Sequence, residues 1–576
     1  MCAVVGVYRR PKFGTDSVLS TVLSMLHRQD NRGDDGWGLS ALHANGAFKV
    51  RLSQISADSD PVLLNAEKTL EGNFNSPAIL GHVRYATSGE IVEKNSQPVQ
   101  NDPKGILPLR QRVSLAFNGN IANVDELRSE LQGELKSEGF TDLANDLDKA
   151  NDTQVLMRLI EQITRRQMAS GRERPDYAEI FRELDQRIDG ACSLVLLDGA
   201  GDMVSYRNSL GIRPLWFAET DDGLLCTASE TNAFKGLRIK GKPLEVPPGE
   251  IIWYDRSRDQ YEHKFVGDPD LEACANECTR PTKLCIFESL YLQSPASEIC
   301  GQENYETRRK IGRAAADVIA PTIRKLSRQA RRNVRIMAVP NTGIAYTEGI
   351  AQRLHELWRG PLSFLRLIRS VAPSVGIQRN PVPRTFLSDE KKRRERLEKK
   401  YTIIGGNVKG KSIWLCDDTL VRSATSEILT RQMYENGAKE VNWVICAPPI
   451  IGRNDYGISI PSLEELAFWK IWKQSTSEER ERLYPANDNW RHEMDLKLLG
   501  EKMAASIKEN LGLPADFKVT VTYLPLDKLK GALPGSPDQY DFSCLDPNQH
   551  PDGSGGYPTP AGQRLFDDNL RKLVAA

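Results

Sequence analysis

The pattern of strands and helices changes once along this chain, at a polar stretch around residues 267–283. Before it, short apolar runs alternate with Gly- and Asn-rich turns and a few amphipathic helices, which is typical of an α+β fold. After it, apolar strands alternate with helices, which predicts parallel strands joined by right-handed crossovers and hence an α/β fold. The 576 residues are enough for each part to bury its own core.

We therefore expect two domains and a C-terminal addition. The first domain covers residues 2–262, the α/β domain covers residues 284–470, and residues 471–576 form a helical extension and return segment that packs on both. Ligands of a parallel sheet bind beyond the carboxyl ends of its strands, so a site is expected there. The elements expected in the α/β domain are strands at 334–339, 413–416 and 441–446 and helices at 345–358 and 426–436.

Composition excludes several classes of partner. Lys and Arg total 77 and Asp and Glu total 77, so no net field favours nucleic acid or an anionic membrane. No apolar run is long enough to span a bilayer, and the start lacks the pattern of a signal peptide. Ten cysteines are scattered along the chain, which favours reduced thiols. We expect a cytoplasmic protein that acts on small molecules and binds neither nucleic acid nor membrane.

The second residue is a cysteine. Removal of Met1 would leave Cys2 with both a thiol and a free α-amino group, and no propeptide is expected. An amine with a pKa of about 7.7–8.0 can take up a thiol proton near neutral pH, so one residue could serve as nucleophile and base. This arrangement is typical of N-terminal nucleophile hydrolases. The alternative is an incidental cysteine.

Two later stretches of the first domain have the composition of site loops. An Asn side chain beside a glycine N–H can stabilise the oxyanion that forms when a thiolate attacks a carboxamide, and Asn118 with Gly119 fits this role. One Arg and one Asp can hold the carboxylate and ammonium of an amino-acid substrate, and Arg84 and Asp152 are the candidates. For the Asn-Gly pair the alternative is a hairpin turn.

These motifs, in this order, resemble the class II glutamine amidotransferase domain over about residues 2–255. The resemblance implies an N-terminal nucleophile hydrolase sandwich of αββα layers, in which glutamine is hydrolysed at Cys2. It also implies that Asn118 and Gly119 form the oxyanion hole and that Arg84 and Asp152 bind glutamine. Residues 34–37 and Phe117 depart from the usual family pattern. The matching stretches are Cys2 and residues 32–38 (RGDDGWG), 81–85 (GHVRY), 117–120 (FNGN), 152–153 (DT), 207–214 (RNSLGIRP) and 228–230 (ASE).

The α/β domain carries two adjacent acids, Asp417 and Asp418, directly after a buried strand-like run. Such acids can accept hydrogen bonds from vicinal ribose hydroxyls, and the following turn and helix N-terminus can hold a phosphate through backbone N–H groups. The sequence therefore predicts a sugar-phosphate site at this strand end. The alternative is a solvated Asp-Asp turn.

The surroundings of the acidic pair resemble the type I phosphoribosyltransferases, and more closely the C-terminal half of the amidophosphoribosyltransferases. The resemblance implies that phosphoribosyl pyrophosphate (PRPP) binds with Mg²⁺ at Asp417 and Asp418, and that a mobile loop carries Arg384. The PRPP-binding residues that it implies are Asp417, Asp418, Thr419, Arg422, Ser423, Thr425, Ser426, Arg384 and Thr342. The matching stretches are residues 285–291 (CIFESLY), 339–343 (VPNTG), 379–380 (RN), 384–387 (RTFL), 417–426 (DDTLVRSATS), 448–450 (PPI) and 456–458 (YGI).

Two departures from that family affect the chemistry. Ser423 and Ala424 stand where the family has Gly and Thr, and Ser is strained at positive φ and crowds a close backbone approach. Some members hold a [4Fe–4S] cluster on four cysteines, of which only Cys285 and Cys544 have counterparts here, with Asn454 in the second region. Two ligands cannot hold such a cluster in its usual form, so no iron–sulfur cluster is expected.

The sequence thus predicts a glutamine-dependent amidophosphoribosyltransferase, an enzyme of purine or related nucleotide metabolism that releases ammonia in one domain and transfers it to C1 of PRPP in the other. Resemblance also implies a homo-oligomer, namely a tetramer. Two alternatives remain open. One is a paralogue that aminates a different phosphosugar or nucleotide, and the other is a nucleotide-binding regulatory protein with an inactive transferase half.

Overall fold

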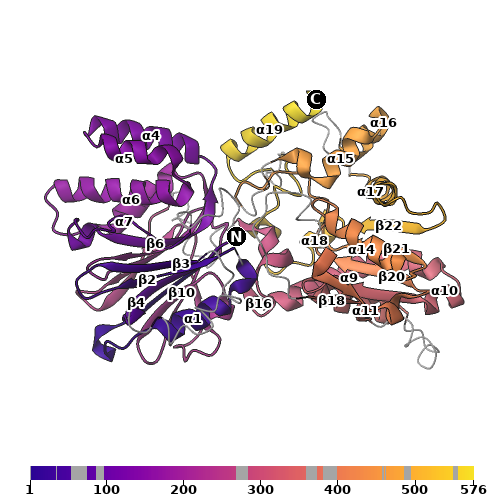
Figure 1. Ribbon diagram of the computed structural model, residues 1–576, viewed down its shortest axis with the longest axis horizontal. Coiled ribbons are helices and arrows are strands. Elements are labelled where there is room, and N and C mark those ends of the chain that lie inside the picture. The colour runs from indigo at the N-terminus through magenta and orange to yellow at the C-terminus, as the bar shows by residue number, and fades with distance from the viewer. Residues whose placement is uncertain are drawn as a thin grey trace.

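The computed structural model describes residues 2–33, 35–53, 70, 74–85, 96–267, 283–358, 373–380, 398–456, 460, 462–484, 494–548 and 556–575. Two bodies lie side by side, and the N-terminus lies at the middle of the molecule, where they meet (Figure 1). Within the described ranges, no helix combines the length and apolarity needed to cross a membrane.

The N-terminal body contains two antiparallel sheets. The first has the strand order β11-β9-β10-β1-β4-β2-β3 and the second the order β13-β12-β8-β7-β6-β5. The strands of the first sheet are β1 (Ala3–Arg9), β2 (Trp37–Leu42), β3 (Phe48–Ser53), β4 (Ala78–Val83), β9 (Trp216–Glu219), β10 (Leu224–Ala228) and β11 (Leu244–Glu245). Those of the second are β5 (Val99–Gln100), β6 (Val113–Ile121), β7 (Gly190–Asp198), β8 (Met203–Arg207), β12 (Glu250–Asp255) and β13 (Gln260–Phe265).

The sheets pack face to face, and helices cover both outer faces. Strand β1 is apolar on both sides because Val4 packs between the sheets while Val5 and Val7 pack in the cluster beneath helix α1. Helix α1 lies on one outer side and helices α4–α7 on the other (Figure 1). This αββα sandwich confirms the predicted fold. The helices are α1 (Leu19–His27), α4 (Val124–Ser137), α5 (Thr141–Asp146), α6 (Asp152–Ala169) and α7 (Tyr177–Arg187).

The C-terminal body is built on a parallel sheet with the order β17-β20-β21-β22, which confirms the predicted α/β class. The expected strands and helices are present, with ends that differ from the expectation by at most two residues. The strands are β17 (Val334–Ala338), β20 (Ser412–Asp417), β21 (Glu440–Ile445) and β22 (Lys518–Tyr523). The main helices are α9 (Asn304–Lys325), α11 (Gly343–Leu357), α14 (Ala424–Glu435) and α17 (Leu496–Leu511).

Strand β22 belongs to the segment 471–576, which differs from the expectation of an extension outside the α/β domain. It pairs in parallel with β21 and buries Val519, Val521 and Tyr523, so the segment completes the sheet. The remaining named elements of this body are α10 (Arg328–Arg332), α13 (Gly405–Val408), α15 (Ala467–Gln474), α16 (Ser477–Leu483), α18 (Leu526–Lys530), α19 (Pro560–Ala575), β14 (Leu284–Cys285), β15 (Glu298–Ile299), β16 (Gln302–Glu303), β18 (Ile377–Arg379), β19 (Tyr401–Ile403) and β23 (Tyr540–Asp541).

Candidate active sites

Cys2 lies at the start of β1, in the middle of the first sheet. Its Sγ is 3.8 Å from the carbonyl oxygen of Tyr85, just beyond the end of the neighbouring strand β4. Burial alone would raise the pKa of the Cys2 thiol, but its interactions with His82 and with the charge of the amino terminus lower it to about 6. A thiol with such a pKa is largely thiolate at neutral pH, which is what a nucleophile requires.

One predicted oxyanion donor is linked to the strand that follows Cys2. Asn118 is fully buried, and its Nδ2 is 3.4 Å from Ser229 Oγ, which accepts a 3.0 Å hydrogen bond from the backbone N–H of Val4. Ser229 therefore connects the Asn118 amide to the first residues after the nucleophile, in strand β1. Gly119 must be glycine, because a Cβ there would lie 1.8 Å from the carbonyl oxygen of Ala191.

Arg84 and Asp152 also meet near Cys2. Burial lowers the pKa of Arg84, while the nearby charges of Cys2, Asp35 and Asp152 oppose that shift. Burial raises the pKa of Asp152, while hydrogen bonds from Thr153 and the charge of Arg84 favour its ionised form. A guanidinium and a carboxylate beside one thiol can hold the two charged groups of an α-amino acid with its side chain directed to sulfur.

Sequence reasoning missed two residues of this site. Gln97 accepts a 2.6 Å hydrogen bond from the Phe117 N–H and donates one of 3.0 Å to Thr153 Oγ1, so it ties the oxyanion strand to the helix that carries Asp152. His82 is fully buried beside Cys2. The strand period could have found His82, since it lies two residues before Arg84 and therefore on the same side of β4.

The acidic pair of the second site lies at the carboxyl end of β20, as predicted. Burial and the adjacent Asp418 raise the pKa of Asp417 well above its usual range, although Lys400 opposes this. Burial also raises the pKa of Asp418, while hydrogen bonds from Thr419 and Thr342 and the charge of Arg308 favour its ionised form. Thr342 immediately precedes helix α11, so two strand ends contribute to one site.

This pair is suited to a divalent cation. Carboxylate oxygens are ligands that Mg²⁺ prefers, and Mg²⁺ commonly binds one or two carboxylates together with substrate phosphates. The negative charges of Asp417 and Asp418 repel each other, which disfavours ionisation of the pair, and a bound cation would offset that repulsion. Among the described residues no cluster of three or more His, Cys, Asp or Glu side chains forms a metal site by itself.

The turn after the acidic pair has the predicted strain. Ser423 adopts φ 62° and ψ −17°, the left-handed region, immediately before α14. Its Oγ donates a 2.9 Å hydrogen bond to Glu427, which also accepts one of 3.1 Å from Asn510. Ser426 Oγ donates to the Ser423 carbonyl at 2.7 Å, which braces the turn from within.

The other residues predicted to bind PRPP have different positions. Thr425 lies in the first turn of α14, beside the turn. Arg422 forms an ion pair with Glu465, which directs its guanidinium toward the short helix η10 (Leu463–Glu465). Arg384 and its expected mobile loop lie outside the described residues.

The two cysteines related to the iron–sulfur ligands lie near each other in the C-terminal body. Cys285 and Cys544 are fully buried, and burial raises the pKa of both thiols. Asn454 hydrogen-bonds Cys544, which favours its ionised form. A polar amide therefore stands beside one of the two thiols, and the expected lack of a cluster stays a prediction.

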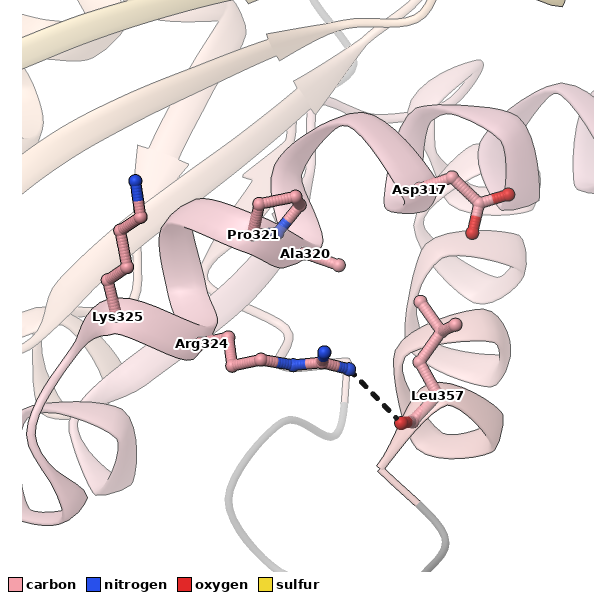
Figure 2. Close-up of a pocket in the computed structure, with 6 residues that line it drawn as sticks. All are labelled: Asp317, Ala320, Pro321, Arg324, Lys325 and Leu357. Atoms are coloured by element: carbon pink, nitrogen blue, oxygen red, sulfur yellow. Dashed lines mark hydrogen bonds between the residues drawn. The ribbon is translucent and has the colours of Figure 1, made fainter.

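A pocket of about 390 Å³ lies away from both sites (Figure 2). It is at the C-terminal ends of α9 and α11, where Arg324 Nη2 is 3.5 Å from the Leu357 carbonyl oxygen. Helix α11 begins beside the acidic pair, and its 15 residues span about 20 Å, so the pocket is at the opposite end of the helix from the strand-end site. Its lining residues are Asp317, Ala320, Pro321, Arg324, Lys325 and Leu357.

Comparisons with known proteins agree with the predicted resemblance. A family model described as a glutamine amidotransferase domain matches residues 82–236. The chain is 28% identical over 558 residues to an amidophosphoribosyltransferase, chloroplastic, of Glycine max, covering 97% of this chain and 78% of the relative. It is also 28% identical over 475 residues to an amidophosphoribosyltransferase of Methanothermobacter thermautotrophicus, covering 81% of this chain and 84% of the relative.

A solved structure has the same fold along nearly the whole chain. It is the glutamine PRPP amidotransferase from B. subtilis complexed with ADP and GMP, with a TM-score of 0.65 and 21% identity, covering 97% of this chain and 98% of that one. The similarity extends across both bodies, so the predicted fold, an αββα sandwich followed by an α/β domain with a parallel sheet, is confirmed.

Proposed function

We propose that this protein is a glutamine-dependent amidophosphoribosyltransferase, a pentosyltransferase with glutaminase activity that makes 5-phosphoribosylamine, pyrophosphate and glutamate from PRPP, glutamine and water. One observation carries the proposal. A single chain holds a thiol with a pKa of about 6 beside a guanidinium–carboxylate pair, and an acidic strand end suited to a sugar phosphate and a cation. The likeness to amidophosphoribosyltransferases over most of the chain supports it.

In the glutaminase half, Arg84 binds the carboxylate of glutamine and Asp152 binds its ammonium. The Cys2 sulfur attacks the side-chain amide carbon, and the Asn118 amide and Gly119 N–H stabilise the oxyanion. The α-amino group of Cys2, freed by removal of Met1, passes the thiol proton to the departing ammonia. Water then hydrolyses the thioester to release glutamate.

In the transferase half, Asp417 and Asp418 orient the ribose by accepting hydrogen bonds from its hydroxyls. The backbone N–H groups of the turn at Ser423 and the hydroxyl of Thr425 bind the 5′-phosphate, while Ser426 braces the turn. Ammonia forms a bond to C1 as the bond from C1 to pyrophosphate breaks, and the leaving group carries away the electron pair. Mg²⁺ held by the two aspartates would supply countercharge for the pyrophosphate.

A two-donor assay tests this proposal. Wild-type protein is given PRPP and Mg²⁺ with either glutamine or ammonium chloride, and pyrophosphate, glutamate and phosphoribosylamine are measured. We expect pyrophosphate with either nitrogen source, and we expect Cys2→Ala to abolish only the glutamine-dependent reaction. Absence of pyrophosphate from wild-type protein with both sources would refute the assignment.

The strained turn favours a second candidate, a paralogue that aminates another phosphosugar or a nucleotide. The side chain of Ser423 and the nearby Glu427 carboxylate narrow the space and add negative charge where a 5′-phosphate would bind. A panel of sugar phosphates in the same assay separates the two candidates. The paralogue is supported if another sugar phosphate reacts with a higher kcat/KM than PRPP.

The proposal includes the expected cytoplasmic location and homo-oligomeric assembly. The Glycine max relative is named chloroplastic, so location is tested by cell fractionation rather than inferred from the family. Native mass spectrometry tests assembly, with a tetramer as the expected species.

A further inference from the structure

Four buried charged side chains lie where the two bodies meet. Glu288 comes from the C-terminal body, in the short π-helix η8 (Glu288–Leu292), and the other three, Arg32, Arg213 and Glu230, come from the sandwich. Arg32 donates to both oxygens of Glu288, at 2.7 and 2.9 Å, and Arg213 donates to Glu288 at 2.9 Å. Each side chain is at most 1% exposed, so the cluster is dry and, with two charges of each sign, neutral.

The cluster touches the nucleophile residue directly. Arg32 Nε donates a 3.0 Å hydrogen bond to the backbone carbonyl of Cys2, while its two Nη atoms hold Glu288 and Glu230. The direction of this guanidinium is therefore fixed by a carboxylate of the other body. Because the carbonyl and the thiol belong to one residue, a rotation of Arg32 moves the start of β1.

The segment that carries Glu288 is held from the transferase side as well. Arg308 donates to the carbonyls of Ser289 and Gln293, at 3.0 and 2.8 Å, and Tyr346 donates to the Leu290 carbonyl at 2.6 Å. The charge of Arg308 also favours ionised Asp418, against the burial that raises the pKa of that carboxyl. Hydrogen bonds thus run from Arg308, whose charge acts on the acidic strand end, through η8 and Arg32 to Cys2.

We propose that Glu288 is a positioning residue for the glutaminase reaction, which holds Arg32 on the Cys2 carbonyl so that the thiol is aligned only when the sandwich is docked on the transferase body. The inference rests on the proposed function. The proposal predicts that the cluster affects the rate at which bound glutamine reacts more than the affinity for glutamine. Arg84 and Asp152, which are proposed to bind glutamine, are not members of the cluster.

The test compares Glu288→Gln with a matched control, Asp189→Asn. Asp189, an acid of the sandwich, likewise forms hydrogen bonds across the junction, with Tyr456 and Thr559 of the C-terminal body at 3.0 and 2.9 Å, and among the described residues it is not hydrogen-bonded to Cys2 or to Arg32. Glutamine-dependent and ammonia-dependent synthesis are measured for both, with kcat and KM for glutamine. Arg32→Lys is added because it keeps the charge but cannot reach both Glu288 and the Cys2 carbonyl.

We expect Glu288→Gln and Arg32→Lys to lower the kcat of the glutamine-dependent reaction at least about tenfold, with KM and the ammonia-dependent rate within about twofold of wild type. Asp189→Asn should leave the ratio of the two activities unchanged. Equal loss of both activities in both cluster variants, or no loss of either, would leave the ratio unchanged and would refute positioning.

A failure of the proposed function and a failure of the positioning proposal would give different results. If wild-type protein makes no phosphoribosylamine from ammonia, the transferase assignment fails. Positioning can still be tested by the alkylation of Cys2 with iodoacetamide, because this reaction needs neither glutamine nor PRPP. Slower alkylation in Glu288→Gln and Arg32→Lys than in Asp189→Asn would still support positioning, and equal rates in all three would overturn it.

Discussion

Replacing His82 tests how the reactive thiol is generated. His82 is fully buried next to Cys2, and it is the largest influence that lowers the pKa of that thiol to about 6. In His82→Gln the interaction of the imidazole with Cys2 is lost while burial remains. Since burial disfavours the thiolate, the pKa of Cys2 should rise, and the thiolate should then persist only at higher pH.

The size of the effect follows from the two pKa values. An ordinary thiol with a pKa of 9.0 is about 1% thiolate at pH 7, whereas a pKa of about 6 gives about 90%. A single close neighbour that stabilises the ionised form shifts a pKa by about 1–3 units, so an increase of about 2 units is expected when His82 is replaced. At pH 6.5 the thiolate fraction of Cys2 would then fall from about 75% to about 3%.

The assay is the rate of alkylation of Cys2 by iodoacetamide between pH 5 and pH 10. Modified peptides are identified by mass spectrometry, because Cys300 is exposed and also reacts. Wild-type protein should give a midpoint near pH 6, and His82→Gln one near pH 8. The high-pH plateau of the variant should equal or exceed that of wild type, since a more basic thiolate is the better nucleophile.

Two results would refute this reasoning. A wild-type midpoint at pH 8 or above would mean that burial outweighs the nearby charges at Cys2. A variant midpoint that stays near pH 6 would mean that the charge of the amino terminus is sufficient without His82. Ammonia-dependent synthesis serves as the folding control, because it does not use the thiol.

Substitutions at three other positions test the glutaminase half and the transferase half separately. Gly119→Ala should lower glutamine-dependent synthesis at least about 100-fold, because the new Cβ would lie 1.8 Å from the Ala191 carbonyl oxygen and displace an oxyanion donor. Retained activity would contradict the oxyanion role of Gly119. Asp417→Asn should lower pyrophosphate release at least about 100-fold with either nitrogen source, while glutamine hydrolysis measured as glutamate continues. Ser423→Gly should lower the KM for PRPP several-fold, because it removes about 1–2 kcal/mol of left-handed backbone strain and opens the turn. Ser423→Ala keeps the strain, so it should leave the KM for PRPP unchanged. Equal KM values for the Gly and Ala variants would contradict that account.

Local patterns were sufficient to predict most of the architecture. The alternation of short apolar runs with longer amphipathic segments after residue 334 marks β17, α11 and β20, because strands that are largely buried on both faces form short, nearly continuous apolar runs. The strain at Ser423 was also predictable, because the family that the sequence resembles has Gly at this position and Gly, unlike Ser, adopts positive φ without strain.

Contacts between distant segments were not predictable in this way. Strand β22 follows a long helical stretch, and its alternating pattern, with Val519, Val521 and Tyr523 buried, does not indicate which sheet it joins. His82 and Gln97 become site residues only because β4 lies beside β1 and the segment at Gln97 lies beside β6. Strand order is a tertiary property, so composition and periodicity alone do not give it.

The interdomain cluster illustrates why buried charges at a junction indicate orientation rather than strength. Removing one member of a buried ion pair typically costs about 3–5 kcal/mol, yet well-packed apolar residues of the same volume are often as stabilising as the intact pair. Adhesion between the two bodies therefore does not require Arg32 and Glu288. Apolar contacts, however, tolerate sliding and rotation, whereas a two-pronged guanidinium–carboxylate pair fixes both distance and angle. At a junction where the same guanidinium also holds the Cys2 carbonyl, that fixed angle determines where the nucleophile lies.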